Sequence, residues 1–188
     1  MSKIKNNPLL KGASGMLGDV VVYREVGGNV IMANRPRKPE VLTAHQEITR
    51  ERFLRAVQYA RTQLANEVTK AEYAAGITAS KLSAYAVALT DYLKAPVVNA
   101  VDVSKYTGAV GELILIRASD DFRVVGVHVV VSDNAGTVIE QGEAVLQPDS
   151  FDDWRYTSTV ANAALAGTKI TVTASDKPGN ATVKETVL

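Results

Sequence analysis

The sequence predicts an α+β fold, in which a short β-hairpin arm and a small helical layer precede a seven-stranded β-sandwich. Two short β runs in residues 20–33 flank a Gly-Gly pair, which is typical of a hairpin. Between positions 43 and 94, apolar residues recur at helical spacing behind capping motifs. Beyond them, short apolar runs alternate with turn signals. We expect an arm with a basic linker over 1–39, a helical region over 40–95 and a sandwich over 96–188.

The composition is that of a globular protein, with 46% hydrophobic and 22% charged residues in 188 positions. The absence of cysteine excludes disulfides, cysteine-based zinc sites and thiol nucleophiles. The first residues are basic and polar with no apolar stretch behind them, so we expect no cleavable signal peptide. No window has the apolar length of a membrane span. These features predict a chain made in the cytoplasm, which reaches a surface or a virion only by export or release.

The net charge of +1 is unevenly distributed along the chain. Residues 1–39 contain seven Lys or Arg and two acidic residues, about +5, whereas residues 96–188 contain seven and twelve, about −5. Opposite charge at the two ends predicts an attraction, either within one molecule or between neighbours. Chance spacing of solvated charges is the alternative interpretation.

The arm begins with Gly12, Gly15 and Gly18 at a spacing of three, which predicts a tight, irregular segment leading into a strand. A phosphate cradle is the alternative, but the pattern fits neither dinucleotide nor Walker motifs. The β runs 20–24 and 29–33 then form the hairpin, and a lone hairpin is only marginally stable in water. It must therefore pack on its own body or on another subunit. The residues we expect to make that contact are Val20, Val22, Tyr23, Val30, Ile31, Met32, Arg35, Arg37 and Lys38.

Three helices are expected in the middle region. Thr43-Ala-His-Gln46 forms a capping box that opens the first, and Thr69-Lys-Ala-Glu72 forms one that opens a short second helix ending at Gly76. The third runs from about 80 to 94, before Pro96. The predicted apolar stripe of the first helix is Ile48, Phe53, Ala56, Val57, Ala60 and Leu64.

The β region is organised around the hairpin 124–145. Its first strand carries Val at alternate positions on one face and a largely apolar second face, which predicts burial in a sandwich. Asp133-Asn-Ala-Gly136 supplies the turn. The expected strands are 97–103, 112–118, 124–132, 137–145, 154–159, 169–174 and 182–187. Seven short strands of this kind fit an immunoglobulin-like sandwich without the cysteine pair, with Trp154 and Tyr156 as core aromatics.

The segment GTKITVTASDKPGNATVKETV resembles the final two strands of bacterial immunoglobulin-like modules. The front segment SGMLGDVVVYREVGGNVIMANRP is similar to a Gly-rich hairpin of uncharacterised bacterial proteins. The resemblance implies the roles that such modules serve, as spacers, adhesive units, or decorations of virions and fibres. A fold by itself does not fix a function.

No catalytic motif is present, and the two histidines, His45 and His128, are not spaced with carboxylates as a site requires. We therefore expect no enzymatic activity and no cofactor. Acidic residues at strand ends are the remaining candidates, since gathered carboxylates could hold Ca²⁺, although solvated turn carboxylates are the default interpretation. This set is Asp102, Asp120-Asp121, Asp152-Asp153 and Asp176.

These features predict a self-assembling structural protein, such as a subunit of a surface filament, fibre or virion. Its arm would add a strand to a sheet edge of the next copy, a strand exchange that makes a head-to-tail homo-oligomer. The alternative is a protein- or glycan-binding module that uses the loop aromatics Tyr106, Phe122 and Phe151. Nucleic-acid binding by the basic arm is disfavoured by the acidic second half, and we expect no membrane insertion.

Overall fold

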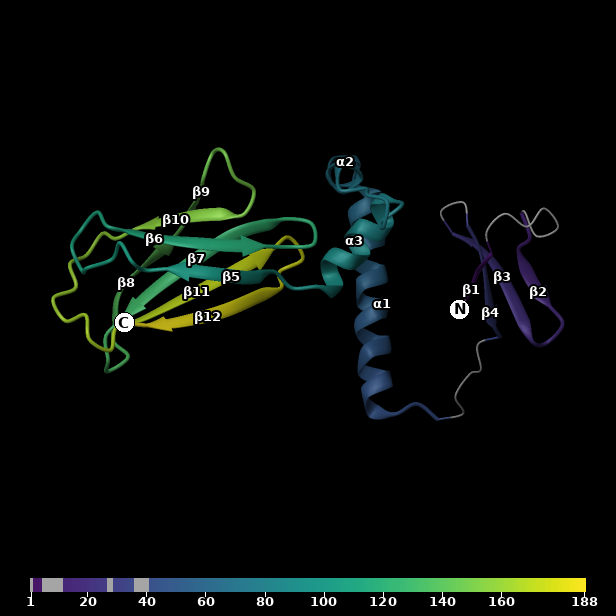
Figure 1. Ribbon diagram of the computed structural model, residues 1–188, viewed down its shortest axis with the longest axis horizontal. Coiled ribbons are helices and arrows are strands. Elements are labelled where there is room, and N and C mark those ends of the chain that lie inside the picture. The colour runs from purple at the N-terminus through teal and green to yellow at the C-terminus, as the bar shows by residue number, and fades with distance from the viewer. Residues whose placement is uncertain (1, 5–11, 27–28, 36–40) are drawn as a thin grey trace.

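The computed structural model describes residues 2–4, 12–26, 29–35 and 41–188, and its fold is α+β. A small antiparallel sheet at the N-terminus is followed by three helices and then by two antiparallel sheets of four strands each. In Figure 1 the helices lie between the N-terminal sheet at one end and the two C-terminal sheets at the other.

The N-terminal sheet, which we call the arm sheet, has the strand order β1-β4-β3-β2. Its strands are β1 (Ser2–Ile4), β2 (Gly15–Leu17), β3 (Val21–Val26) and β4 (Asn29–Asn34). β3 and β4 pair antiparallel as the predicted hairpin, and Gly27 and Gly28 between them lie outside the described residues. The strands β1 and β2 were not predicted, so the arm is a four-stranded sheet and not a hairpin alone. Gly12, Gly15 and Gly18 have φ values of 78°, 114° and 57°, a backbone region that favours glycine.

The helices are α1 (Ala44–Ala65), α2 (Glu67–Ala75) and α3 (Ala84–Leu93). The capping box of α1 forms as predicted, because Gln46 N donates to Thr43 Oγ1 while Thr43 N donates to the Gln46 side chain. The predicted capping box of α2 is wrong. Asn66 caps this helix by accepting hydrogen bonds from two backbone N–H groups, and Thr69 lies inside the first turn.

The predicted start of α3 near Ser80 is also wrong, because Ser83 caps the helix and accepts a hydrogen bond from Ala86 N. The predicted apolar stripe of α1 is buried only in part. Ala56 and Ala60 are fully buried, but Ile48 and Phe53 remain 64% and 47% exposed. In Figure 1 the N-terminal half of α1 extends past α3, so neither of the other two described helices covers this end of the stripe.

The two C-terminal sheets have the orders β5-β6-β10-β9 and β12-β11-β7-β8. The strands are β5 (Val97–Asp102), β6 (Leu113–Ser119), β7 (Val124–Ser132), β8 (Val138–Glu143), β9 (Val145–Leu146), β10 (Asp153–Thr157), β11 (Lys169–Asp176) and β12 (Ala181–Val187). One apolar core lies between them and takes side chains from both. Its largest contributions include Ile114, Ile116, Val127, Val129, Trp154, Tyr156, Ile170 and Val172.

Two features of the central hairpin differ from the prediction. The expected strand 137–145 is divided at the buried residue Ala144, so β8 belongs to one sheet and β9 to the other. In β7 the register against β11 shifts near Ser175, and Val124 points into the core while Val125 is 48% exposed. A β-bulge of this kind changes which residues of a strand face the core.

Candidate functional site

The arm sheet exposes apolar side chains on both of its faces. Cross-strand partners share a face, so Tyr23 and Met32 lie on one side of the sheet and Val22 and Ala33 on the other. Among the arm residues of β2, β3, β4 and the turns beside them, Val30 is the one apolar side chain that is buried. Those that remain substantially exposed are Met16, Leu17, Val20, Val26 and Met32. A small sheet with two apolar faces and almost no core needs a covering surface to be stable in water.

Most of the predicted contact residues fall on this sheet. Val22, Tyr23, Val30, Ile31 and Met32 lie in β3 and β4. Val20 lies in the turn before β3 and is 68% exposed. Arg35 follows β4, where its guanidinium donates to Asp19 at 2.6 Å. Arg37 and Lys38 lie outside the described residues.

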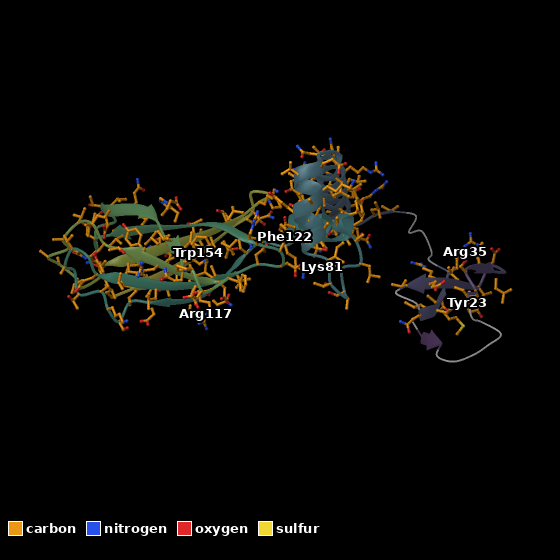
Figure 2. All side chains as sticks on the ribbon, turned by 90° about the horizontal axis from the view of Figure 1, so that it is seen from above. Tyr23, Arg35, Lys81, Arg117, Phe122 and Trp154 are labelled. Atoms are coloured by element: carbon orange, nitrogen blue, oxygen red, sulfur yellow. The ribbon has the colours of Figure 1, made fainter. Side chains whose placement is uncertain are left out.

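The rest of the described chain does not supply the covering surface. The four arm strands pack on one another, and no extensive packing joins them to a described helix or C-terminal strand. Figure 1 and Figure 2, which view the molecule from perpendicular directions, both show the arm sheet standing apart from the helices. Tyr23 and Arg35 are labelled on it in Figure 2. No other described part of the chain therefore covers the apolar faces of the arm.

A second constellation lies where the helices meet the C-terminal sheets, which we call the junction. The ring of Phe122, from the loop between β6 and β7, lies 4.7 Å from the ring of Tyr73 in α2. The absence of a side chain at Gly76 makes room for Phe122, because a Cβ there would lie 2.9 Å from its ring. The junction is thus a packed interface between α2 and a sheet loop.

Polar side chains also cross the junction. Asp121 accepts from Lys81 and Lys94 at 2.8 Å and 2.9 Å, which joins the loop after β6 to both ends of the α3 segment. Lys177 pairs with Glu72, which joins the turn between β11 and β12 to α2. These ion pairs fix the helices to the ends of the sheets.

Three carboxylates gather at the centre of the junction. One oxygen from each of Asp91, Asp120 and Asp176 lies within 4.8 Å of the others. Asp91 and Asp176 are almost completely buried, at 0% and 3% exposure. Tyr73 donates to Asp91 Oδ2 at 2.6 Å, and Tyr59 lies within hydrogen-bonding distance of Tyr73 at 2.7 Å. The cluster therefore continues into a tyrosine pair in the helical layer.

The pKa values reflect this burial. Burial raises the pKa of Asp91 to about 7, against the opposing effect of the Tyr73 hydrogen bond and with further increases from the neighbouring Asp120 and Asp176. Burial also raises the pKa of Asp176, although Asn180 donates two hydrogen bonds that favour its charged form. Burial and hydrogen bonding to Asp91 raise the pKa of Tyr73 far above its ordinary value, so this phenol stays a donor.

The predicted acidic set is only partly brought together. Asp120 and Asp176 meet at the junction, and Asp91 joins them although sequence reasoning assigned it to a helix alone. Asp153 instead accepts from Arg117 at 2.9 Å, and Asp102 caps the backbone N–H of Ser104 at 2.9 Å. Asp102 and Asp153 therefore lie on separate turns with partners of their own, as solvated turn carboxylates do.

The three loop aromatics proposed as contact residues have different surroundings. Tyr106 is 5% exposed and belongs to the core between the sheets. Phe122 packs on Tyr73 at the junction. Phe151 is 97% exposed in the loop between β9 and β10. Of the three, Phe151 alone presents its ring to solvent.

Comparisons with known proteins do not place this chain in a family. No protein-family model matches it, and no curated protein matches it significantly. Among solved structures, the crystal structure of an engineered protein is similar over 48% of this chain, with 20% sequence identity and a TM-score of 0.33. The matched region spans 19% of that engineered protein. The chain is described by its own architecture, an α+β protein rich in antiparallel sheets. Among the described residues, the longest and most apolar helices still lack the length or hydropathy of a membrane span.

Proposed function

We propose that this protein is a non-enzymatic structural protein that assembles with copies of itself through the arm sheet. The observation that carries the proposal is the exposure of apolar side chains on both faces of a four-stranded sheet that packs extensively on no other described part of the chain. Burying one large aliphatic side chain stabilises a contact by about 1.5–3 kcal/mol. The exposed residues of the arm sheet therefore supply enough apolar surface for a stable interface.

The charge distribution supports a head-to-tail arrangement. In the sequence, the arm and linker carry a net charge of about +5 and the C-terminal sheets about −5. The arm of one copy is therefore attracted to the C-terminal sheets of another, whereas two arms, or two sets of C-terminal sheets, repel each other. A contact between two different surfaces of identical chains is heterologous, and it builds rings or filaments. The arm has short edge strands, and a neighbour's sheet edge such as β12 offers unpaired backbone groups to them. A filament, fibre or virion subunit is the kind of structure that this geometry would build.

The strand orders support an immunoglobulin-like sandwich as the finer description of the C-terminal region. In that fold one sheet has the order A-B-E-D and the other contains G-F-C. The order β5-β6-β10-β9 corresponds to the first, and β12-β11-β7-β8 corresponds to the second with one additional strand. The single tryptophan departs from the antibody pattern, since Trp154 lies on β10 rather than on the third strand. Such domains commonly serve as structural units.

The proposal is tested by comparing the full chain with a chain that lacks residues 1–34, using multi-angle light scattering and negative-stain microscopy. We expect the full chain to form oligomers and the truncated chain to be a folded monomer. Raising the ionic strength should shift the full chain toward monomer, because salt screens the attraction between basic arm and acidic body. A full chain that is monomeric at high concentration, or a truncated chain that still assembles, contradicts the proposal.

A point substitution separates assembly from folding. Leu17 is 66% exposed on the arm sheet, so Leu17→Lys removes apolar contact area without disturbing a core. We expect it to weaken self-association at least tenfold, since about 1.4 kcal/mol corresponds to that factor. Val110→Lys is the matched control, because Val110 is 61% exposed in the turn before β6 and the variant also replaces an exposed aliphatic side chain by lysine. This control should assemble as the unchanged protein does.

A protein- or glycan-binding module is the second candidate, and the exposure of Phe151 is the observation in its favour. An aromatic ring presented on a loop is a common anchor in recognition surfaces. A binding screen with the unchanged protein and with Phe151→Ala tests this candidate. A ligand whose binding is lost in the variant supports it, and retention of binding in Phe151→Ala contradicts it.

A further inference from the structure

We propose that Asp91, Asp120 and Asp176 form a calcium-binding site that fastens the helical layer to the C-terminal sheets. The proposal is independent of self-assembly through the arm. It concerns residues that three separate elements bring to the junction.

The convergence of these residues depends on the fold and not on a local motif. Asp91 lies in the last turn of α3, Asp120 follows β6 directly, and Asp176 is the last residue of β11. One oxygen from each lies within 4.8 Å of the others. That is the span between ligands on opposite sides of a Ca²⁺ ion at about 2.4 Å from each. One ion at the centre could therefore contact all three carboxylates.

Two buried oxygens of the cluster accept from no N–H or hydroxyl group, and the carboxyl groups of Asp91 and Asp120 that carry them lie within hydrogen-bonding distance of each other. Asp91 is fully buried, and while its Oδ2 accepts from Tyr73, its Oδ1 accepts from no such group. Asp120 Oδ2 accepts from the backbone N–H groups of Phe122 and Arg123, both at 3.1 Å, and its Oδ1 accepts from no such group. A buried acceptor without a donor costs free energy that a bound cation would recover. These two oxygens belong to the ligand set itself.

The neighbouring cations do not neutralise the cluster. Lys81 and Lys94 pair with Asp121, and Lys177 pairs with Glu72. Among the residues that the structure describes, no Lys, Arg or His forms an ion pair with Asp91, Asp120 or Asp176. Several carboxylates buried together without a counter-charge repel each other and are poorly solvated. A divalent cation supplies the missing positive charge.

The ligand set favours calcium over magnesium. All the available donors are oxygens, which both ions accept. Magnesium, however, requires a near-ideal octahedron at about 2.1 Å and retains several waters. Asp91 and Asp176 are nearly inaccessible to solvent, so the several water ligands of a bound Mg²⁺ ion do not fit beside them. Calcium tolerates irregular geometry and longer distances, which suits carboxylates held by three different elements.

The test is thermal unfolding of the full chain, first stripped with EDTA and then supplied with Ca²⁺ or Mg²⁺ alone, together with titration calorimetry. We expect one Ca²⁺ per chain. At about 100 times the dissociation constant, we expect the melting temperature to rise by about 5–10 °C. Mg²⁺ at equal concentration should give a smaller rise. Asp120→Asn should lose the rise and weaken Ca²⁺ binding by roughly tenfold or more, because it removes a charged ligand. Asp149→Asn, an exposed acid with the same change, should behave as the unchanged protein.

An absence of binding heat and of any melting shift at millimolar Ca²⁺ overturns the proposal. In that case an Asp120→Asn variant that melts higher than the unchanged protein in EDTA would show that Asp91 and Asp120 share a proton instead. A shift that survives unchanged in Asp120→Asn also overturns it. Should that variant fail to fold, terbium binding to the unchanged protein, sensitised by nearby Tyr73 and displaced by Ca²⁺, decides the same question.

Discussion

Phe122 at the junction gives a quantitative test of how the helices are held to the sheets. Its ring lies 4.7 Å from that of Tyr73 and fills the space above Gly76. Truncation of a fully buried Phe to Ala costs about 3–5 kcal/mol. Phe122 is only half-buried, which reduces that figure, whereas loss of the aromatic pair adds about 0.5–1.5 kcal/mol. We expect Phe122→Ala to lower the free energy of unfolding by about 2–3 kcal/mol.

The assay is urea unfolding followed by two probes. Circular dichroism at the helical minimum reports α1–α3, and fluorescence of Trp154, the single tryptophan, reports the core between the C-terminal sheets. If the junction couples the two parts, Phe122→Ala should lower the midpoint of both signals. The matched control is Phe151→Ala, which makes the same substitution at a side chain that is 97% exposed. The control should change the free energy by no more than about 0.5 kcal/mol.

A change below about 0.5 kcal/mol in Phe122→Ala would refute this reasoning, because surface substitutions give effects of that size. A loss seen by circular dichroism but not by Trp154 fluorescence would show that the helices unfold independently of the sheets. The junction would then hold the helices without making one cooperative unit.

Three further outcomes are expected. Gly76→Ala should cost about 1–3 kcal/mol by overpacking, since its new Cβ would lie 2.9 Å from the Phe122 ring, and a neutral result in urea unfolding would contradict the packing described. Thr43→Ala should cost about 1 kcal/mol and reduce helical circular dichroism, because it removes the cap of α1, and Thr43→Ser should restore most of it. Hydrogen bonds from the Thr107 hydroxyl and backbone hold the pKa of Glu112 below its ordinary value. That stabilisation is present above the unfolded pKa and is lost as the pH falls through the folded pKa. The melting temperature should therefore fall less steeply between about pH 5 and 3 in Thr107→Ala than in the unchanged protein. An equally steep fall in both proteins would exclude this role.

Local patterns predicted those parts of the fold that neighbouring residues determine. The capping box at Thr43 and the turn at Asp133 form because each side chain bonds backbone groups within four residues. The same rule misplaced the cap of α2, where both Asn66 and Thr69 are suitable residue types. Asn66 caps the helix, while the Thr69 hydroxyl bonds the carbonyl of Gln63 in α1. Competition between two adequate caps is decided by the preceding helix, which local sequence does not describe.

Local sequence patterns did not predict the features that depend on contacts between distant segments. The apolar character of Ile48 predicted burial, but this side chain is 64% exposed and lines an open surface pocket together with Tyr92 of α3. Val125 follows the alternation of its strand, yet the bulge opposite Ser175 reverses which neighbour faces the core. Asp91 occupies an ordinary helical position, and its meeting with Asp120 depends on how α3 lies against the loop that follows β6. The sequence predicted an arm that cannot bury its own apolar side chains, because the small size of its strands is a local feature.

The C-terminal core is buried without the arm, whereas the arm has almost no core of its own. Self-assembly through the arm can therefore be tested separately from the folding of the rest of the chain. In β2, β3 and β4 of the arm, Val30 is the one buried apolar side chain. The C-terminal core, by contrast, includes residues such as Val127 and Val172 that are completely buried without any contribution from the arm. Removing residues 1–34 should therefore leave the unfolding midpoint of Trp154 fluorescence almost unchanged. If the arm instead served to stabilise its own body, the same truncation would lower that midpoint, because a lost core layer reduces the free energy of unfolding by several kcal/mol. A truncated chain with an unchanged midpoint and an altered oligomeric state would mean that the arm's apolar faces are covered by another copy.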